Sequence, residues 1–234
     1  MTAKARLLAW LRLFRIVNLP TVPGDVLAGA AVSIHFARGG CLPNLWWAAL
    51  ASVLVYMFGL ADNDIAGAKT DKGRPIPDGE ISQSAARVAR GFALGAVLII
   101  GSIADLPPAW WIVAFALVVL IVVYNRTKLA FLMGACRALD VILGAAAVGA
   151  AIGWGVSIVA IVWGLYFFFV TKCSEGEEED AGKKNLVGVL IGSSVYLQLV
   201  VLLAFPCKPL LIAGAALLIV HRFVRKLLPE VDAS

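Results

Sequence analysis

Ten of the fifteen acidic residues of this 234-residue chain fall in two short segments. Each segment contributes five of them: Asp62, Asp64, Asp71, Asp78 and Glu80 in the first, and Glu175, Glu177, Glu178, Glu179 and Asp180 in the second. Mg²⁺ is commonly held by one or two carboxylates and bridges them to a phosphorylated ligand. The residue types therefore predict either a magnesium–phosphate site built from both segments or two solvated acidic loops.

The elements that position these segments are predicted to be membrane-spanning helices. Hydrophobic residues make up 61% of the chain and charged residues 15%, with a mean hydropathy of +0.91. A soluble domain averages about 45–50% apolar and about 25% charged residues, so a soluble globular protein is excluded. We predict one all-α integral membrane domain over residues 1–234, a polytopic helix bundle of about eight spans. The apolar runs are 19–37, 44–61, 84–104, 109–124, 132–151, 153–172, 186–206 and 209–226.

Lysine and arginine are distributed unevenly between the two faces of this predicted bundle. Only Arg38 and Lys208 fall on one face, and the remaining basic residues fall on the other. The positive-inside rule then places both termini and both acidic segments in the cytoplasm, which requires an even number of spans. We predict a multi-pass protein of a prokaryotic inner (plasma) membrane. The net charge of +5 suits anionic membrane lipid, and nothing indicates nucleic acid.

The two acidic segments follow the second and the sixth predicted spans, so four spans separate them. This spacing predicts two four-helix repeats whose acidic segments face each other across a central cavity.

The first acidic segment, residues 60–82, reads LADNDIAGAKTDKGRPIPDGEIS. It resembles the first aspartate-rich motif of the UbiA superfamily of membrane prenyltransferases, NDxxDxxxD followed by RPIPSGxIS. The resemblance implies a UbiA-like helix bundle over most of the chain. It also implies transfer of an isoprenyl group from a prenyl diphosphate to an acceptor, with Mg²⁺ as cofactor.

Within that resemblance, Asn63, Asp64 and Asp71 match the metal–diphosphate motif, and Arg74 matches its trailing Arg-Pro. In such chemistry carboxylates hold Mg²⁺ against the departing diphosphate, and Arg and Lys contact the remaining oxygens. Gly67 stands where the family usually has its middle aspartate. The stretch between Asp71 and Arg74 is also shorter than usual.

Three shorter segments extend the resemblance. Residues 124–128, YNRTK, look like the family's Tyr-Ser-x-x-Leu-Lys, so Tyr124 and Lys128 are candidate diphosphate contacts; an interfacial tyrosine and a positive-inside lysine are the alternative. Arg15 and Asn18 resemble the Arg-Pro-x-Asn entry to the first helix, which makes Asn18 a candidate substrate contact. In the second acidic segment, Glu178 falls at the final aspartate of the pattern KDxxDxEGDxxxGxxTL, although the leading aspartates are absent.

The fifth predicted span opens with MGACRALDVILG at residues 133–144. This is similar to the MGxCRxLNxLLG segment of a UbiA-like subgroup encoded in Ebo-type clusters, which are linked to export of natural-product precursors. Arg137 and Asp140 share one helix face, and an ionisable pair inside a span is a functional-site candidate. A structural ion pair between helices is the alternative.

The sequence thus predicts a Mg²⁺-dependent prenyltransferase whose partners are an isoprenyl diphosphate, an unknown acceptor and membrane lipid. The predicted catalytic residues are Asp64, Asp71 and Lys128; the metal ligands Asp64, Asp71 and Glu178; and the substrate-binding residues Asn18, Asn63, Arg74, Tyr124 and Arg137. The alternative is a non-catalytic UbiA-like scaffold that binds a lipid or isoprenoid metabolite in a biosynthesis or export system. A transporter fits less well, because its polar chemistry would lie at the midplane and not at one face.

Overall fold

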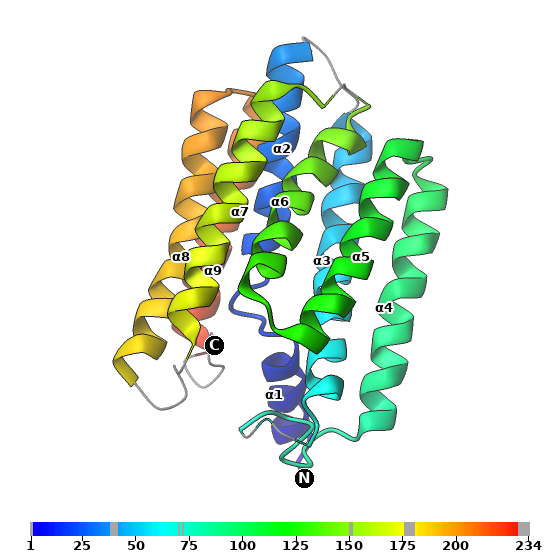
Figure 1. Cartoon of the computed structure of the whole chain (residues 1–234), viewed down its shortest axis with the longest axis vertical. Helices are drawn as coiled ribbons and strands as arrows, with labels where there is room; N and C mark the ends of the chain where they lie inside the picture. The colour runs from blue at the N-terminus through cyan, green and yellow to red at the C-terminus, as the bar shows by residue number, and fades with distance from the viewer. Residues whose placement is uncertain are drawn as a thin grey trace.

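A computed structural model describes residues 2–37, 42–69, 71, 73–149, 152–175 and 181–228. Over these residues the chain is all-helical, which confirms the predicted fold class, and it forms one upright bundle (Figure 1). The helices are α1 (Ala3–Leu13), α2 (Thr21–Ala37), α3 (Leu42–Ala66), α4 (Gln83–Ile103), α5 (Pro108–Thr127), α6 (Ala130–Ala147), α7 (Trp154–Ser174), α8 (Ala181–Ala204) and α9 (Lys208–Leu227).

Six helices, α3 to α8, are long and apolar enough to cross a membrane. The chain is therefore an integral membrane protein. Helix α2 has only 17 residues, and α9 carries Arg222, Arg225 and Lys226 near its end. Both nevertheless run along the length of the bundle beside the six (Figure 1), so the prediction of eight spans rests on these two helices.

The centre of the bundle is the contact between α2 and α6, which both pack against several other helices. Two glycines permit this contact. A Cβ atom on Gly29 of α2 would overlap the carbonyl oxygen of Val141, and one on Gly144 of α6 would overlap the carbonyl oxygen of Val26. Small residues allow such close approach of helix backbones in a membrane, so the two backbones touch reciprocally.

The short helix α1 packs beneath the bundle against the segment that joins α3 to α4. Ala9 and Leu13 are buried against Ile76 and Ile81 of that segment. Arg12 adds an ion pair to Glu80 at 2.9 Å. The N-terminal helix therefore secures the first acidic segment to the end of the bundle.

Figure 1 shows α1, the α3–α4 segment, the α5–α6 turn and the end of α9 at the same end of the bundle. The first aspartate-rich segment and the Tyr124–Lys128 stretch, which are far apart in the sequence, therefore lie at one end of the molecule.

The α2–α6 contact predicts a large effect from one added methyl group. Gly144→Ala is expected to lower the free energy of unfolding by about 1–3 kcal/mol, because the methyl overpacks a backbone contact. The measurement is unfolding of the purified protein in mixed micelles. Gly91→Ala on α4, where an added Cβ meets nothing, is the control and should change stability by less than about 1 kcal/mol. Equal effects of the two substitutions would contradict the close contact.

Candidate active site

A cavity of about 340 Å³ opens among α3, α5 and α6 at the end of the bundle that carries the first acidic segment. Its apolar wall includes Val55, Leu117 and Ile121. Six of the residues predicted from sequence line it: Asn63, Asp71, Arg74, Tyr124, Lys128 and Arg137. The structure thus gathers α3, α5, α6, the α3–α4 loop, Arg15 of the α1–α2 link and Ser174 of α7 around a single space with both charged and apolar lining.

Two predicted residues are placed differently, and a third is not among the described residues. Asp64 is buried next to Arg74 without lining the cavity. Asn18 is buried in the link between α1 and α2 and is not part of the cavity wall. Glu178 lies outside the described residues, so its predicted metal role stays a prediction.

Asp64 is a buried carboxylate whose two oxygens are in different surroundings. Its side chain is 3% exposed, and its Oδ1 atom lies 3.9 Å from Nη1 of Arg74. Its buried Oδ2 atom has no hydrogen-bond partner within the described part of the chain. Asp71 lies close enough to interact with it electrostatically. A buried carboxylate oxygen without a donor is costly, and Mg²⁺ needs only one or two protein carboxylates beside waters and phosphates. Asp64 and Asp71 therefore fit a Mg²⁺ site.

The missing middle aspartate of the motif has a structural counterpart. A Cβ atom on Gly67 would overlap the carboxylate of Asp71, and the Asp71 N–H donates to the Gly67 carbonyl at 2.9 Å. The Asp71 carboxylate thus occupies the space that a side chain at position 67 would enter. The glycine and the placement of Asp71 depend on each other.

Besides Arg137, three cationic side chains line the same cavity: Arg15, Arg74 and Lys128. Arg15 and Lys128 both have left-handed backbone conformations, with φ of 40° and 55°. A non-glycine residue in this region is uncommon and strained, and such residues concentrate at functional sites. The sequence signal for Arg15 was its spacing to Asn18, whereas its conformation could not be seen from residue types.

Lys128 contacts both Asn63 and Tyr124. It is the residue that caps the C-terminal end of α5. Its Nζ atom donates a hydrogen bond to the Asn63 Oδ1 atom and lies 6.0 Å from the ring centre of Tyr124. Burial lowers the pKa of Lys128, and the charge of Asp71 opposes this shift by raising the pKa. The neighbouring Arg74 lowers it further. An anion that binds among these cations would relieve their mutual repulsion.

Asp62, the first acid of the motif region, has a structural role. It is buried and accepts hydrogen bonds from Arg90 at 2.8 Å, Asn125 at 2.9 Å and Arg126 at 3.0 Å. These contacts join α3, α4 and α5 and neutralise the carboxylate.

Deeper in the bundle, Arg137 forms an ion pair with Asp25 of α2 at 2.9 Å. The Oδ1 atom of Asp25 also accepts hydrogen bonds from Trp163 Nε1 at 2.7 Å and from Gln198 Nε2 at 2.6 Å. The guanidinium carbon of Arg137 lies 4.2 Å from the ring centre of Phe167. Arg137 therefore lines the cavity and also joins α6 to α2. Among the described residues its ion-pair partner is Asp25 on α2, whereas the sequence paired it with Asp140 on its own helix.

Asp140, which also lines the cavity, accepts a hydrogen bond from Ser52 Oγ at 2.7 Å. Asp25 and Asp140 each begin the same pentapeptide pattern, Asp-Val-x-x-Gly, at residues 25–29 and 140–144. The glycines of these two repeats are the ones that make the α2–α6 contact. This internal repeat is the sequence signal that places Asp25 and Asp140 at equivalent positions on α2 and α6.

The fold and the cavity define an integral membrane protein with a charged site at one end of an apolar bundle. The sequence profile of the UbiA prenyltransferase family matches residues 17–226. The chain belongs to this family. No comparison tests the likeness to the Ebo-type subgroup. A search of curated protein sequences found no match.

Solved structures share the fold at low sequence identity. A UbiA homologue from Archaeoglobus fulgidus bound to GPP and Mg²⁺ has a TM-score of 0.59 at 15% identity, over 95% of this chain and 87% of that chain. The same homologue bound to DMAPP and Mg²⁺ has a TM-score of 0.58 at 15% identity, over 94% and 87%. A structure described for digeranylgeranylglyceryl phosphate synthase has a TM-score of 0.57 at 16% identity, over 97% and 90%.

The buried ion pair predicts a strong coupling between two substitutions. Arg137→Leu is expected to cost about 3–5 kcal/mol of unfolding free energy, because it leaves a buried carboxylate without its counter-charge. Adding Asp25→Asn should recover a large part of that loss, as measured by unfolding in mixed micelles. Arg12→Gln breaks the half-exposed pair with Glu80 and, as the control, should cost at most about 1 kcal/mol. Strict additivity of the two core substitutions would contradict the coupling.

Proposed function

We propose that this protein is a Mg²⁺-dependent prenyltransferase that moves an isoprenyl group from a prenyl diphosphate to an acceptor. The observation that carries the proposal is the cavity itself, where Arg15, Arg74 and Lys128 gather beside Asp71 above an apolar wall. Cations and a metal-binding acid suit a diphosphate, and an apolar wall suits an isoprenyl chain. The family match and the neighbours bound to GPP and DMAPP support the same assignment.

In the proposed reaction, the bond between the allylic carbon and the diphosphate oxygen breaks, and the electron pair leaves with the diphosphate. Asp64 and Asp71 would hold Mg²⁺, which supplies positive charge to the leaving group when bound. Arg74, Lys128 and Arg15 would bind the remaining phosphate oxygens, and Lys128 would be oriented by its hydrogen bond to Asn63. The apolar wall formed by Val55, Leu117 and Ile121 would exclude water from the allylic cation.

An acceptor nucleophile would then form a bond to the allylic carbon in the same cavity, and the proton it loses would pass to the released diphosphate. Arg137 and Asp140 line the cavity from α6, so we assign them to acceptor contact, beside their role in joining the helices. Tyr124 lies near Lys128 and is assigned to the diphosphate side. Asn18 would act by supporting the α1–α2 link that carries Arg15, and Glu178 stays a candidate ligand for a second Mg²⁺.

We further infer eight spans in two four-helix repeats, α2–α5 and α6–α9. The reciprocal α2–α6 contact, made by the first helix of each half through the same pentapeptide pattern, supports this layout. Basic residues at the end of the bundle that carries the cavity support a cytoplasmic active site and cytoplasmic termini. A prokaryotic inner membrane fits this arrangement.

Thermal stability of the detergent-purified protein tests the proposed site without knowledge of the acceptor. Geranyl, farnesyl or geranylgeranyl diphosphate is expected to raise the Tm with Mg²⁺ but not with EDTA. Ligand at about 100 times its Kd should stabilise by about 2.7 kcal/mol. Asp64→Asn and Asp71→Asn should each abolish the Mg²⁺-dependent shift. Asp78→Asn, in the same segment but exposed, should retain it.

Release of diphosphate from the prenyl donor separates the two candidate functions. A transferase should release diphosphate once a suitable acceptor is added, whereas a non-catalytic scaffold would bind the donor and leave it intact. Absence of any Mg²⁺-dependent shift, with all three chain lengths, would contradict the proposed diphosphate site.

The dependence between Gly67 and Asp71 gives a second prediction. Gly67→Ala is expected to displace the Asp71 carboxylate and to weaken Mg²⁺-dependent binding of prenyl diphosphate by about tenfold, a loss of about 1.4 kcal/mol. The exchange Gly67→Asp with Asp71→Gly should bind better than Asp71→Gly alone, because it returns a carboxylate to the same space. Isothermal titration measures both affinities. Unchanged affinity in Gly67→Ala would show that Asp71 does not depend on the glycine.

A further inference from the structure

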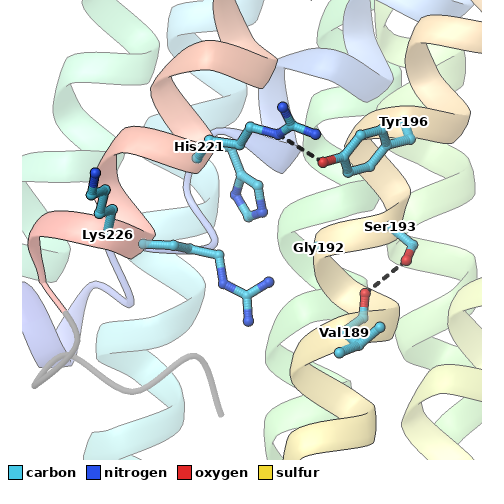
Figure 2. A pocket seen from close by; sticks show the side chains of 8 residues that line it. Val189, Gly192, Ser193, Tyr196, His221 and Lys226 are labelled. Carbon is cyan, nitrogen blue, oxygen red and sulfur yellow. Dashed lines mark hydrogen bonds between the residues drawn. The ribbon is translucent and has the colours of Figure 1, made fainter.

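A second cavity, separate from the proposed active site, lies between α8 and α9 (Figure 2). Its volume is about 430 Å³. Figure 2 shows the ring of His221 on α9 turned toward α8, with Tyr196 and Ser193 on the opposite wall. Arg222, Arg225 and Lys226 complete the α9 side. We call this cavity the α8–α9 groove.

The positive charge of the α8–α9 groove is not balanced by acidic residues on α8 or α9. Residues 181–228, which include α8 and α9, contain no aspartate or glutamate. Among the described residues, the ion pairs do not include Arg222, Arg225 or Lys226. Three cations that share one groove repel each other, so the site favours a multivalent anion.

Arg222 is held in place by contacts with α8, and Arg225 lies close against the same helix. The Arg222 Nε atom donates a hydrogen bond to the Tyr196 hydroxyl at 2.9 Å, and its guanidinium carbon lies 5.5 Å from the Tyr196 ring centre. That bond uses one of five guanidinium N–H donors. Gly192 has no side chain to separate Arg225 from α8, because a Cβ there would lie 2.7 Å from Arg225 Nη1. These two basic side chains of the groove are therefore positioned by α8 and are not independent surface charges.

His221 adds an oriented polar group. Its Nδ1 atom lies 3.2 Å from the carbonyl oxygen of Val17. Because a carbonyl only accepts hydrogen bonds, Nδ1 carries the hydrogen. The other ring nitrogen, Nε2, lies on the groove side, where a Cβ on Gly192 would be 3.2 Å from it.

Apolar surface continues from the α8–α9 groove toward the middle of the bundle. Val200 follows Tyr196 by four residues and Ile219 precedes Arg222 by three, so each shares a helix face with the groove residue. Both are well exposed, at 59% and 68%. A ligand with a phosphate group at one end and hydrocarbon chains at the other would match this basic groove and the apolar surface next to it.

We propose that the α8–α9 groove binds the phosphate group of an anionic phospholipid, with its acyl chains along α8 and α9. Basic pockets between transmembrane helices are suited to such head groups. The groove residues of α9 lie near the end of that helix, which Figure 1 places at the same end of the bundle as α1. A free phosphate ion shares the head-group chemistry and is distinguished by the experiment below. The proposal is independent of the prenyl transfer assigned to the other cavity.

Native mass spectrometry of the full chain from detergent micelles tests this proposal. The probes are phosphatidylglycerol and phosphatidylcholine with identical acyl chains, and sodium phosphate in a parallel arm. Phosphatidylglycerol is expected to bind more tightly than phosphatidylcholine. Arg222→Gln with Arg225→Gln should lower its affinity by about tenfold or more, since each basic residue near the surface contributes about fivefold.

Three further variants complete the experiment. Lys208→Gln, at the opposite end of α9, and Arg74→Gln, in the other cavity, should retain the preference. Tyr196→Phe removes only the hydroxyl that orients Arg222 and should weaken it partially, which keeps the test valid if the double variant does not fold. Competition by sodium phosphate at equal concentration would assign the groove to the free ion. Equal binding of the two lipids, or an unchanged preference in both groove variants, would overturn the proposal.

Discussion

The direct backbone contact between α2 and α6 is the constraint on which the rest of the structure depends. Gly29 and Gly144 each lie against a carbonyl oxygen of the other helix, so neither position accepts a side chain. The same two helices carry the Asp25–Arg137 ion pair, which hydrogen bonds from α7 and α8 stabilise. In a bilayer, where the hydrophobic effect does not drive helices together, close packing and buried polar contacts supply the association. The remaining helices surround this pair.

The arrangement separates two kinds of chemistry along the bundle. Near the centre, Arg137 neutralises Asp25 between helices, and because the pair is buried it stabilises the bundle only when both partners are present. At the end beneath α3 and α5, by contrast, Arg15, Arg74 and Lys128 share a cavity with Asp71. The strained backbones of Arg15 and Lys128 are maintained by the surrounding helices and direct positive charge to one place. Such a concentration of cations is useful only if an anion enters, which is the physical basis of the proposed diphosphate site.

Much of the fold follows from the apolar runs, because bilayer thickness sets the length of a spanning helix. The run 84–104 corresponds closely to α4, whereas the run 44–61 ends before α3 does, at Ala66. Helix α3 continues through Asp62 because Arg90 and Arg126 neutralise that acid, and hydropathy carries no information on such partners. The aspartate-rich motif indicated the family and the cavity-lining residues Asn63, Asp71 and Arg74. It could not reveal the structural use of Asp62 or the packing of Asp71 on Gly67, since both depend on contacts between segments distant in sequence or on loop conformation.

The central claim is that Asp64 and Asp71 hold a divalent cation against a prenyl diphosphate in the α3–α5–α6 cavity. Mn²⁺ can replace Mg²⁺ as a paramagnetic probe, with geranyl S-thiolodiphosphate as an unreactive donor. Pulsed electron paramagnetic resonance then measures the hyperfine coupling between Mn²⁺ and phosphorus. The account predicts ³¹P coupling in the unmodified protein that is lost in Asp71→Asn and retained in Asp78→Asn. Bound Mn²⁺ without ³¹P coupling, or coupling that persists in Asp71→Asn, would contradict it.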